Sequence, residues 1–194
     1  ERRVDDLVSE RVDEPRVRVE RMIADNPQEE LKRLDDAIAK LRESVDLMLD
    51  SSELDLTGEG REVIEAYRLF AYDQGWRQRM RDAVRSGLTA EAGVERVQDD
   101  MRLRVQRFND PVLRERAHDL DDLARRLLRH LSGDADRDPR LDMRKDAVLI
   151  ARVMGPAELL DYGRDKLVGL ILEDAAATSH VAIVARSMGL ALAG

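Results

Sequence analysis

The chain has 194 residues, of which 38% are charged and only 3% aromatic, and its formal net charge is −8. This acidity argues against nucleic acid as a partner, because phosphate binding requires a positive surface. The absence of cysteine excludes a disulfide scaffold and a zinc–thiolate site, and it fits a reducing compartment. No apolar run could span a bilayer and no signal peptide begins the sequence, so we expect no membrane contact and a cytoplasmic location.

Residues 1–26 form an N-terminal segment with two different patterns. Residues 1–14 are rich in charge, as in an exposed helix or a tail, whereas apolar residues alternate over 16–23 as in a strand. We therefore expect this segment to be a linker helix or a strand of the later α/β domain.

Residues 27–133 carry the period of amphipathic helices. Asn26 and Pro27 are typical of a helix start, and apolar residues then recur at three- and four-residue steps up to Met48. Further along, Gly87 is typical of a helix end and Thr89 of a new N-cap. The pattern predicts a bundle of helical hairpins joined by short connections.

A polar linker at residues 134–140 separates this bundle from a region with a different pattern. Residues 147–153 and 167–172 are continuous apolar runs of strand length, and residues 179–188 have the pattern of a helix. We expect residues 141–194 to form an α/β domain that is incomplete at its C-terminus. The predicted fold class is therefore mainly α with an α/β part.

Three histidines are candidates for chemistry. His118 and His130 lie among charged residues of a predicted helix, where an exposed or capping histidine is the ordinary reading. His180 instead follows a predicted strand, three alanines, Thr178 and Ser179, and it opens a helix. The two hydroxyls can cap that helix or donate hydrogen bonds to phosphate oxygens, and a helix N-terminus favours an anion. The layout fits either a phosphohistidine or a histidine that caps or packs the helix.

The residues around His180 resemble a known signature. Residues 178–186 are similar to the pattern T-S-H-x-[AS]-I-x-A-R of phosphoenolpyruvate-utilising enzymes. The resemblance implies a swivelling domain whose histidine takes a phosphoryl group from phosphoenolpyruvate bound on a separate barrel domain. The chain departs from sugar-type members in one respect, because Ala175–Ala177 stand where those members have paired glycines.

The upstream bundle narrows the resemblance to Enzyme I of the phosphoenolpyruvate phosphotransferase system. Residues 114–128 are similar to the Enzyme I run K-E-R-A-x-D-x-x-D-x-x-x-R-L-L, and residues 156–158 are similar to its P-S-E turn. This likeness implies a phosphoenolpyruvate-protein phosphotransferase that passes the group to a histidine of an HPr-like carrier docked on the bundle. Residues 14–17 and 180–186 look more like the nitrogen-related paralogue, whose carrier is NPr.

The resemblance also implies the positions of partners and cofactors. It places the carrier on the second helix of the bundle and its successor, with these docking residues: Glu65, Tyr67, Arg68, Phe70, Ala71, Asp73, Gln74 and Trp76. The alternative for the three aromatic residues is a place in the core. Magnesium is expected for the first transfer step, but its ligands belong to the barrel domain, which this fragment lacks, so no metal ligand is expected here. The full-length protein is expected to be a homodimer.

Two rival interpretations stay open at this point. The chain could be the mobile phosphohistidine domain of a dikinase or synthase, although it shows no nucleotide-binding region upstream. It could also be a non-catalytic helical sensory or adaptor module. Phosphate on His180 would argue against the adaptor, and carrier binding would argue against the dikinase.

Overall fold

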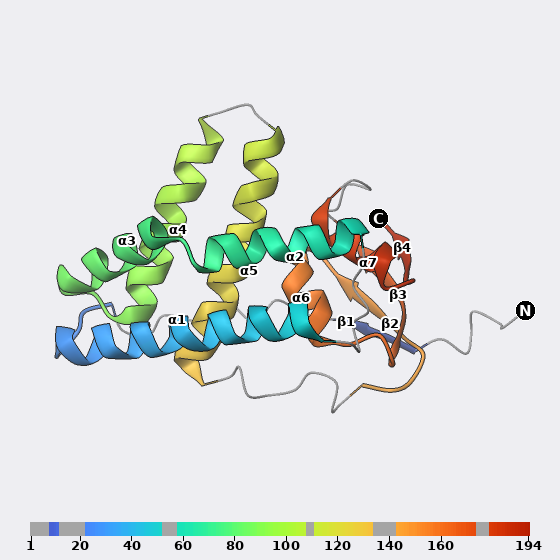
Figure 1. Cartoon of the computed structure of the whole chain (residues 1–194), viewed down its shortest axis with the longest axis horizontal. Helices are drawn as coiled ribbons and strands as arrows, with labels where there is room; N and C mark the ends of the chain where they lie inside the picture. The colour runs from blue at the N-terminus through green and yellow to red at the C-terminus, as the bar shows by residue number, and fades with distance from the viewer. Residues whose placement is uncertain (1–7, 12–21, 52–57, 108–110, 134–142, 174–178) are drawn as a thin grey trace, which may run out of the picture. The chain divides into compact units, whose positions relative to one another are not determined.

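The computed structural model describes residues 8–11, 22–51, 58–107, 111–133, 143–173 and 179–194 (Figure 1). The fold is mostly helical with a small parallel sheet, so the predicted fold class is confirmed. The chain divides into two compact units. The sheet unit comprises Glu1–Pro15, Leu47–Glu65 and Arg137–Gly194, and the helical unit comprises Arg16–Asp46 and Ala66–Asp136.

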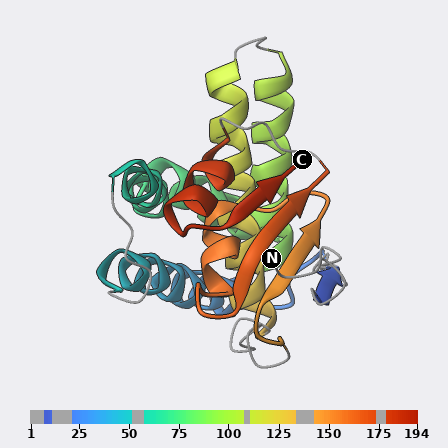
Figure 2. The same ribbon diagram turned by 90° about the vertical axis from the view of Figure 1, so that its right-hand side faces the viewer.

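Among the described residues, the sheet unit contains four parallel strands in the order β1-β2-β3-β4. The strands are β1 (Val8–Arg11), β2 (Ala147–Ala151), β3 (Leu167–Leu172) and β4 (Ala191–Ala193). Helix α6 (Pro156–Asp161) connects β2 to β3, and α7 (His180–Ser187) connects β3 to β4. Because parallel crossovers are right-handed and the strand order advances in one direction, both helices cover the same face of the sheet (Figure 2).

The two faces of this sheet differ in burial. On one face the side chains of Leu149, Leu170 and Leu172 are almost fully buried. On the other face Val148 is half-buried and Ile171 is 40% exposed. The continuous apolar runs that predicted the strands therefore hold the sheet core on the helix-covered side.

The first strand lies earlier in the chain than the sequence pattern indicated. β1 is formed by Val8–Arg11, inside the stretch expected to be a charged helix or a tail, and it pairs in parallel with β2. Residues 16–21 of the expected strand and the linker at 134–140 lie outside the described residues. The pairing of β1 joins residues far apart in sequence, and local alternation carries no information about such a contact.

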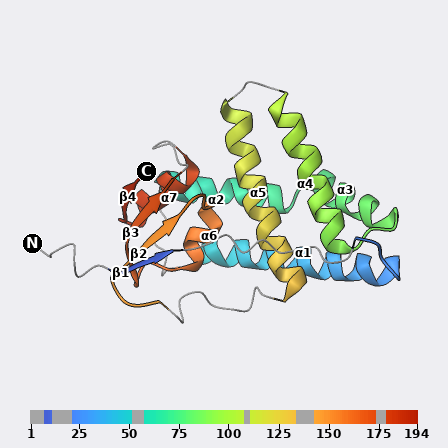
Figure 3. The same cartoon turned by 180° about the vertical axis from the view of Figure 1, so that it is seen from behind.

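In the part of the helical unit that the structure describes there are five helices, of which α1 and α2 also have residues in the sheet unit. Their bounds are α1 (Pro27–Asp50), α2 (Gly58–Ala71), α3 (Gln74–Arg85), α4 (Ala90–Gln106) and α5 (Pro111–Ser132). The last residues of α1 belong to the sheet unit when the chain is divided by compactness, but the apolar period of the sequence assigns the whole helix to the bundle. The expected domain boundaries therefore stay a prediction. Figure 3 shows α4 beside α5, and these two helices pack along much of their length.

Local capping explains where several helices begin and end. The Asn26 side chain accepts a hydrogen bond from Gln28 N at 3.1 Å, and Thr89 Oγ1 accepts one from Ala92 N at 3.3 Å. Gly87 has a φ of 103°, a conformation that suits glycine after a helix end. The predicted helix starts at Pro27 and after Thr89 are therefore confirmed.

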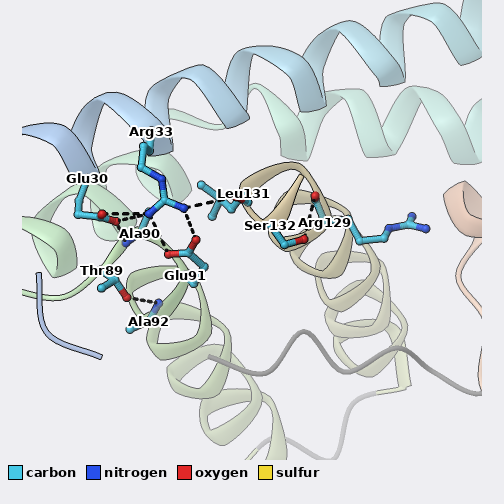
Figure 4. Close-up of polar contacts among 9 residues, drawn as sticks. All are labelled: Glu30, Arg33, Thr89, Ala90, Glu91, Ala92, Arg129, Leu131 and Ser132. Atoms are coloured by element: carbon cyan, nitrogen blue, oxygen red, sulfur yellow. Dashed lines mark hydrogen bonds and ion pairs between the residues drawn. The ribbon is translucent and has the colours of Figure 1, made fainter. Parts of the chain in front are cut away.

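Ion pairs join the helices around an apolar core that contains Leu34, Leu41, Met80, Leu123 and Leu127. At one end of the bundle, Arg33 of α1 bonds to Glu30 on its own helix, Glu91 of α4 and the Leu131 carbonyl of α5 (Figure 4). Glu30 in turn accepts a hydrogen bond from Ala90 N, the first residue of α4. The Arg33 guanidinium and the carboxylates of Glu30 and Glu91 thus connect the ends of three helices.

Candidate functional site

The carboxyl ends of the parallel strands gather at one edge of the sheet, which we call the carboxyl edge. The β2–β3 register pairs Ala151 with Leu172, and Glu173 N donates a hydrogen bond to the Ala151 carbonyl at 3.1 Å. Arg152 and Glu173, the residues that follow the two strands, are therefore neighbours there and both are exposed. In open parallel sheets this edge is the usual place for ligand binding.

His180 is the first residue of α7. The helix returns from the end of β3 to the start of β4, so its N-terminus lies at the carboxyl edge. Val181, Ala182, Val184 and Ala185 are buried and anchor the helix to the sheet unit. His180 itself is half-buried.

Ser179 is the N-cap of α7, but its side chain makes no capping hydrogen bond. Its Oγ is buried and has no hydrogen-bond partner among the described residues. A buried hydroxyl is stabilised by a hydrogen bond, and at a helix N-terminus it is placed to donate one to an anion. Together with the amide groups of the first turn, the arrangement fits an anion beside His180. Thr178, the other predicted supporting residue, lies outside the described residues.

The other two histidines have ordinary settings in α5. His118 is exposed and His130 is half-buried near the end of that helix. In the described parts of the chain, no three histidine or acidic side chains lie close enough together to hold a metal ion. Among the described helices, none is both long and apolar enough to cross a membrane.

The expected docking residues fall into two groups. Glu65, Arg68, Asp73 and Gln74 are exposed and Phe70 is half-buried. Arg68 and Glu65 form ion pairs with Asp46 and Arg61, and the Asp73 side chain caps α3. The other three are buried and present little surface to a partner: Tyr67, Ala71 and Trp76. These three lie on the inner faces of α2 and α3, as the core alternative for Tyr67 and Trp76 implied.

Tyr67 has a polar environment inside the helical unit. Its side chain is fully buried, and Asp119 and Asp122 of α5 are also almost fully buried. Burial raises the pKa of Tyr67 well above its ordinary value, and the nearby carboxylates of Asp122 and Asp119 raise it further. The tyrosine is therefore neutral in the folded bundle.

Sequence reasoning missed one exposed feature beside these residues. Tyr72 is 40% exposed, its hydroxyl donates to Asp46 at 2.6 Å, and Arg42 lies over its ring at 4.7 Å from the centroid. Leu69, one turn earlier on α2, is 76% exposed. The exposure of Leu69 could have been predicted, because this residue lies opposite the apolar stripe of α2. No sequence pattern indicated that the Tyr72 side chain contacts charged groups of α1.

A groove between α3 and α4 was also missed. Its volume is about 360 Å³, and its floor includes Val97, which is buried. Three exposed arginines line it: Arg79, Arg96 and Arg104. No sequence pattern marks this groove, because it exists only where the two helices pack together.

Comparison with known protein families gives matches over both regions of the chain. Residues 6–116 match the family described as "PEP-utilising enzyme, N-terminal", and residues 143–192 match "PEP-utilising enzyme, mobile domain". The second match contains His180 and Ser179. The first alone covers more than half of the chain.

Curated relatives and solved structures agree with this assignment. A "Phosphoenolpyruvate-protein phosphotransferase" of Priestia megaterium is 26% identical over 179 residues, which cover 92% of this chain and 31% of that protein. The "Phosphoenolpyruvate-dependent phosphotransferase system" protein of Escherichia coli (strain K12) is 32% identical over 128 residues, covering 66% of this chain and 17% of that protein. The chain thus spans about a third or less of these relatives.

Two solved structures share the fold at 24% identity. One is described as "N-terminal domain of Enzyme 1 - Nitrogen", with a TM-score of 0.69 over 95% of this chain and 76% of that one. The other is described as an NMR solution structure of "Enzyme I (nEIt)", with a TM-score of 0.67 over 91% of this chain and 73% of that one. The family predicted from residues 178–186 is confirmed, and this chain belongs to the phosphoenolpyruvate-utilising enzymes of the Enzyme I type.

Proposed function

We propose that this chain is the phosphoryl-accepting part of a phosphoenolpyruvate-protein phosphotransferase, with His180 as the residue that carries the phosphoryl group. The observation that supports this most directly is the half-buried His180 at the start of α7, beside a buried Ser179 hydroxyl that lacks a partner among the described residues. The match of residues 143–192 to the family's mobile domain supports the same role.

The first transfer step uses the ring of His180 as a nucleophile. A ring nitrogen attacks the phosphorus of phosphoenolpyruvate, and the bond from phosphorus to the enol oxygen breaks. The leaving enolate takes up a proton to become pyruvate, and the ring releases the proton from its other nitrogen to solvent. Ser179 Oγ and the first amides of α7 donate hydrogen bonds to the phosphoryl oxygens, which stabilises the charge on the transferred group.

The second step passes the phosphoryl group to an HPr-like carrier, which in the nitrogen branch is NPr. A histidine of the carrier attacks the phosphorus, the bond to the His180 nitrogen breaks, and the ring recovers its lone pair. The carrier docks on the exposed face of α2 and α3, where Glu65, Arg68, Asp73 and Gln74 are accessible and Leu69 offers an apolar contact. Exposed apolar side chains among polar ones are typical of such contact surfaces.

We assign the binding of phosphoenolpyruvate and Mg²⁺ and the formation of the dimer to parts of the protein outside this chain. Phosphoenolpyruvate and Mg²⁺ would bind to a separate barrel domain, as the resemblance to Enzyme I implies. That domain would also carry the homodimer contact of the full-length protein. A cytoplasmic location and a role in nitrogen regulation complete the proposal.

The test is intact-mass analysis after incubation with phosphoenolpyruvate, Mg²⁺ and the barrel domain added in trans. We expect one acid-labile phosphoryl group on the wild type and none on His180→Ala. His118→Ala is the matched control, because His118 is exposed on α5 and should leave the modification unchanged. A folded wild type that takes up no phosphate, even from a phosphorylated HPr-like donor, would contradict the proposal.

A further inference from the structure

The carboxyl edge holds a cation that the family signature does not include. Arg152 immediately follows β2, is exposed, and lies beside Glu173 at the end of β3. The α7 N-terminus with His180 lies at this same edge. The sheet therefore brings Arg152 to the edge where the phosphoryl group would reside, although the two residues belong to different connections.

A phosphoryl group on His180 needs positive charge that α7 itself does not supply. The first turn of α7 contains no lysine or arginine, and Arg186 lies in its last turn. The helix N-terminus offers only partial positive charge, and the Ser179 hydroxyl offers a neutral donor. The whole chain is acidic, with a net charge of −8, so the surrounding field does not compensate. Two described residues with charged side chains, Arg152 and Glu173, directly follow strands at this edge. Arg152 is the cation of the two.

A guanidinium is well suited to this task. It stays protonated at every physiological pH, and its planar fork can donate two parallel hydrogen bonds to phosphate oxygens. The opposite edge provides a matched comparison, because Arg164 precedes β3 and lies near Gly189 before β4. Arg164 is also exposed but lies at the amino ends of the strands.

We propose that Arg152 binds the phosphoryl group on His180, with its guanidinium contacting the phosphoryl oxygens and offsetting their charge. This inference rests on the proposed role of His180. Arg152 holds the phosphoryl group in one orientation and leaves the face opposite the P–N bond open to the next nucleophile. It also stabilises the dianionic form of the phosphohistidine relative to the monoanion.

The test is a ³¹P NMR pH titration of the full chain phosphorylated with potassium phosphoramidate. In that reaction a ring nitrogen of His180 attacks phosphorus, the P–N bond of phosphoramidate breaks, and ammonia leaves and takes up the proton released by the ring. His180→Ala identifies the His180 resonance by its loss. The charged groups of this edge are Arg152 and Glu173, and the helices packed beside it add Glu158 in the first turn of α6, and Asp161 and Arg186 at the far ends of α6 and α7.

We expect Arg152→Ala to raise the pKa of the phosphoryl group by about one unit, the effect of removing a nearby opposite charge. Arg152→Lys should restore part of the shift, because it keeps the charge and loses the fork. Arg164→Ala should titrate like the wild type. If Arg152 only stabilised the fold, the pKa of the phosphoryl group would not be highest in Arg152→Ala, intermediate in Arg152→Lys and unchanged in Arg164→Ala.

Two outcomes overturn the inference, and they are distinguishable. If the wild type carries the His180 resonance but Arg152→Ala titrates identically, the Arg152 contact is wrong and the role of His180 stands. If folded wild type acquires no phosphate on His180, the proposed function fails and the inference fails with it. Circular dichroism of each variant establishes folding, and Arg152 is exposed, so its replacement leaves no cavity.

Discussion

Arg33 on α1 bonds to the carboxylate of Glu91, in the first turn of α4, through both terminal nitrogens of its guanidinium. Nη2 lies 2.5 Å from Oε1 and Nη1 lies 3.4 Å from Oε2. Glu91 at a helix N-terminus is itself favourable, because the helix dipole attracts negative charge there. The contact joins the N-terminal ends of two helices that are distant in sequence.

Replacing Arg33 with alanine should lower the free energy of unfolding by about 1 kcal/mol, the upper end for a partly exposed ion pair. Arg33→Lys should recover less than the full loss, because lysine cannot form the fork to Glu91 and still reach the Leu131 carbonyl. Denaturant unfolding measures both. Arg85→Ala is the control, since Arg85 pairs only locally with Asp82; an equal loss in that variant would contradict a special role for Arg33.

Asp35 should make part of the stability depend on acid pH. Burial of this carboxyl opposes ionisation, but hydrogen bonds from Arg81 and Arg77 outweigh it and hold its pKa below the ordinary 3.8. A lowered pKa in the folded state means that the stabilisation is present above pH 3.8 and is lost as pH falls through the folded value.

The variant Asp35→Asn should therefore be less stable than the wild type from pH 7 down to about pH 5 by a constant amount. The difference should shrink at lower pH, as Asp35 of the wild type becomes protonated. Urea unfolding at a series of pH values measures it. A difference that grows on acidification would show that the sign is wrong.

Tyr67 should produce the opposite behaviour in alkali. Its pKa in the fold is raised above 10.0, so its contribution is present below pH 10 and is lost as pH rises toward the folded value. We expect the difference absorbance spectrum of wild type minus Tyr67→Phe to show no tyrosinate until the helical unit unfolds. Ionisation of Tyr67 at an ordinary pH, with the helices intact by circular dichroism, would contradict its burial.

Gly93 should be required for the packing of α4 on α3. A Cβ added there would lie 2.9 Å from Val84 Cγ2 and 3.5 Å from the Met80 carbonyl oxygen. Gly93→Ala should cost about 1–2 kcal/mol of unfolding free energy, because overpacking outweighs the better helix propensity of alanine. Val84→Ala removes the clashing methyl, so the double variant should lose less than the sum of the two single losses. Strict additivity would show that the clash does not occur.

Two N-cap hydroxyls should behave differently when removed. Thr89→Ala deletes a capping bond to Ala92 N and should cost about 1 kcal/mol. Ser179→Ala deletes a hydroxyl that makes no capping bond, so its stability should stay within about 0.5 kcal/mol of the wild type. Thermal unfolding of the two variants compares them. An equal cost at both positions would mean that the Ser179 hydroxyl is structural and not reserved for a ligand.

Much of the local structure was predictable because its causes lie within a few residues. The starts at Pro27 and after Thr89 depend on caps that act within one turn, and Gly87 supplies a conformation that other residues avoid. The same holds for His180 at the start of α7, where a strand, small residues and a cap stand in order along the chain.

Other features depended on contacts between distant residues. The pairing of β1 with β2, the burial of Tyr67 and Trp76, and the meeting of Arg152 with the end of β3 are absent from any local pattern. Hydrophobic periodicity shows that an aromatic residue lies on an apolar stripe, but only packing shows whether another helix covers it.

The amino-acid sequence by itself determined the family and the helical and α/β regions, and it singled out His180 as the candidate nucleophile, because each depends on a contiguous stretch of residues. Only the tertiary structure decided which docking residues are accessible, which strand opens the sheet and which cation shares an edge with His180. These features arise from backbone pairing and helix packing between residues far apart in the chain, and such contacts are selected by the free energy of the whole fold.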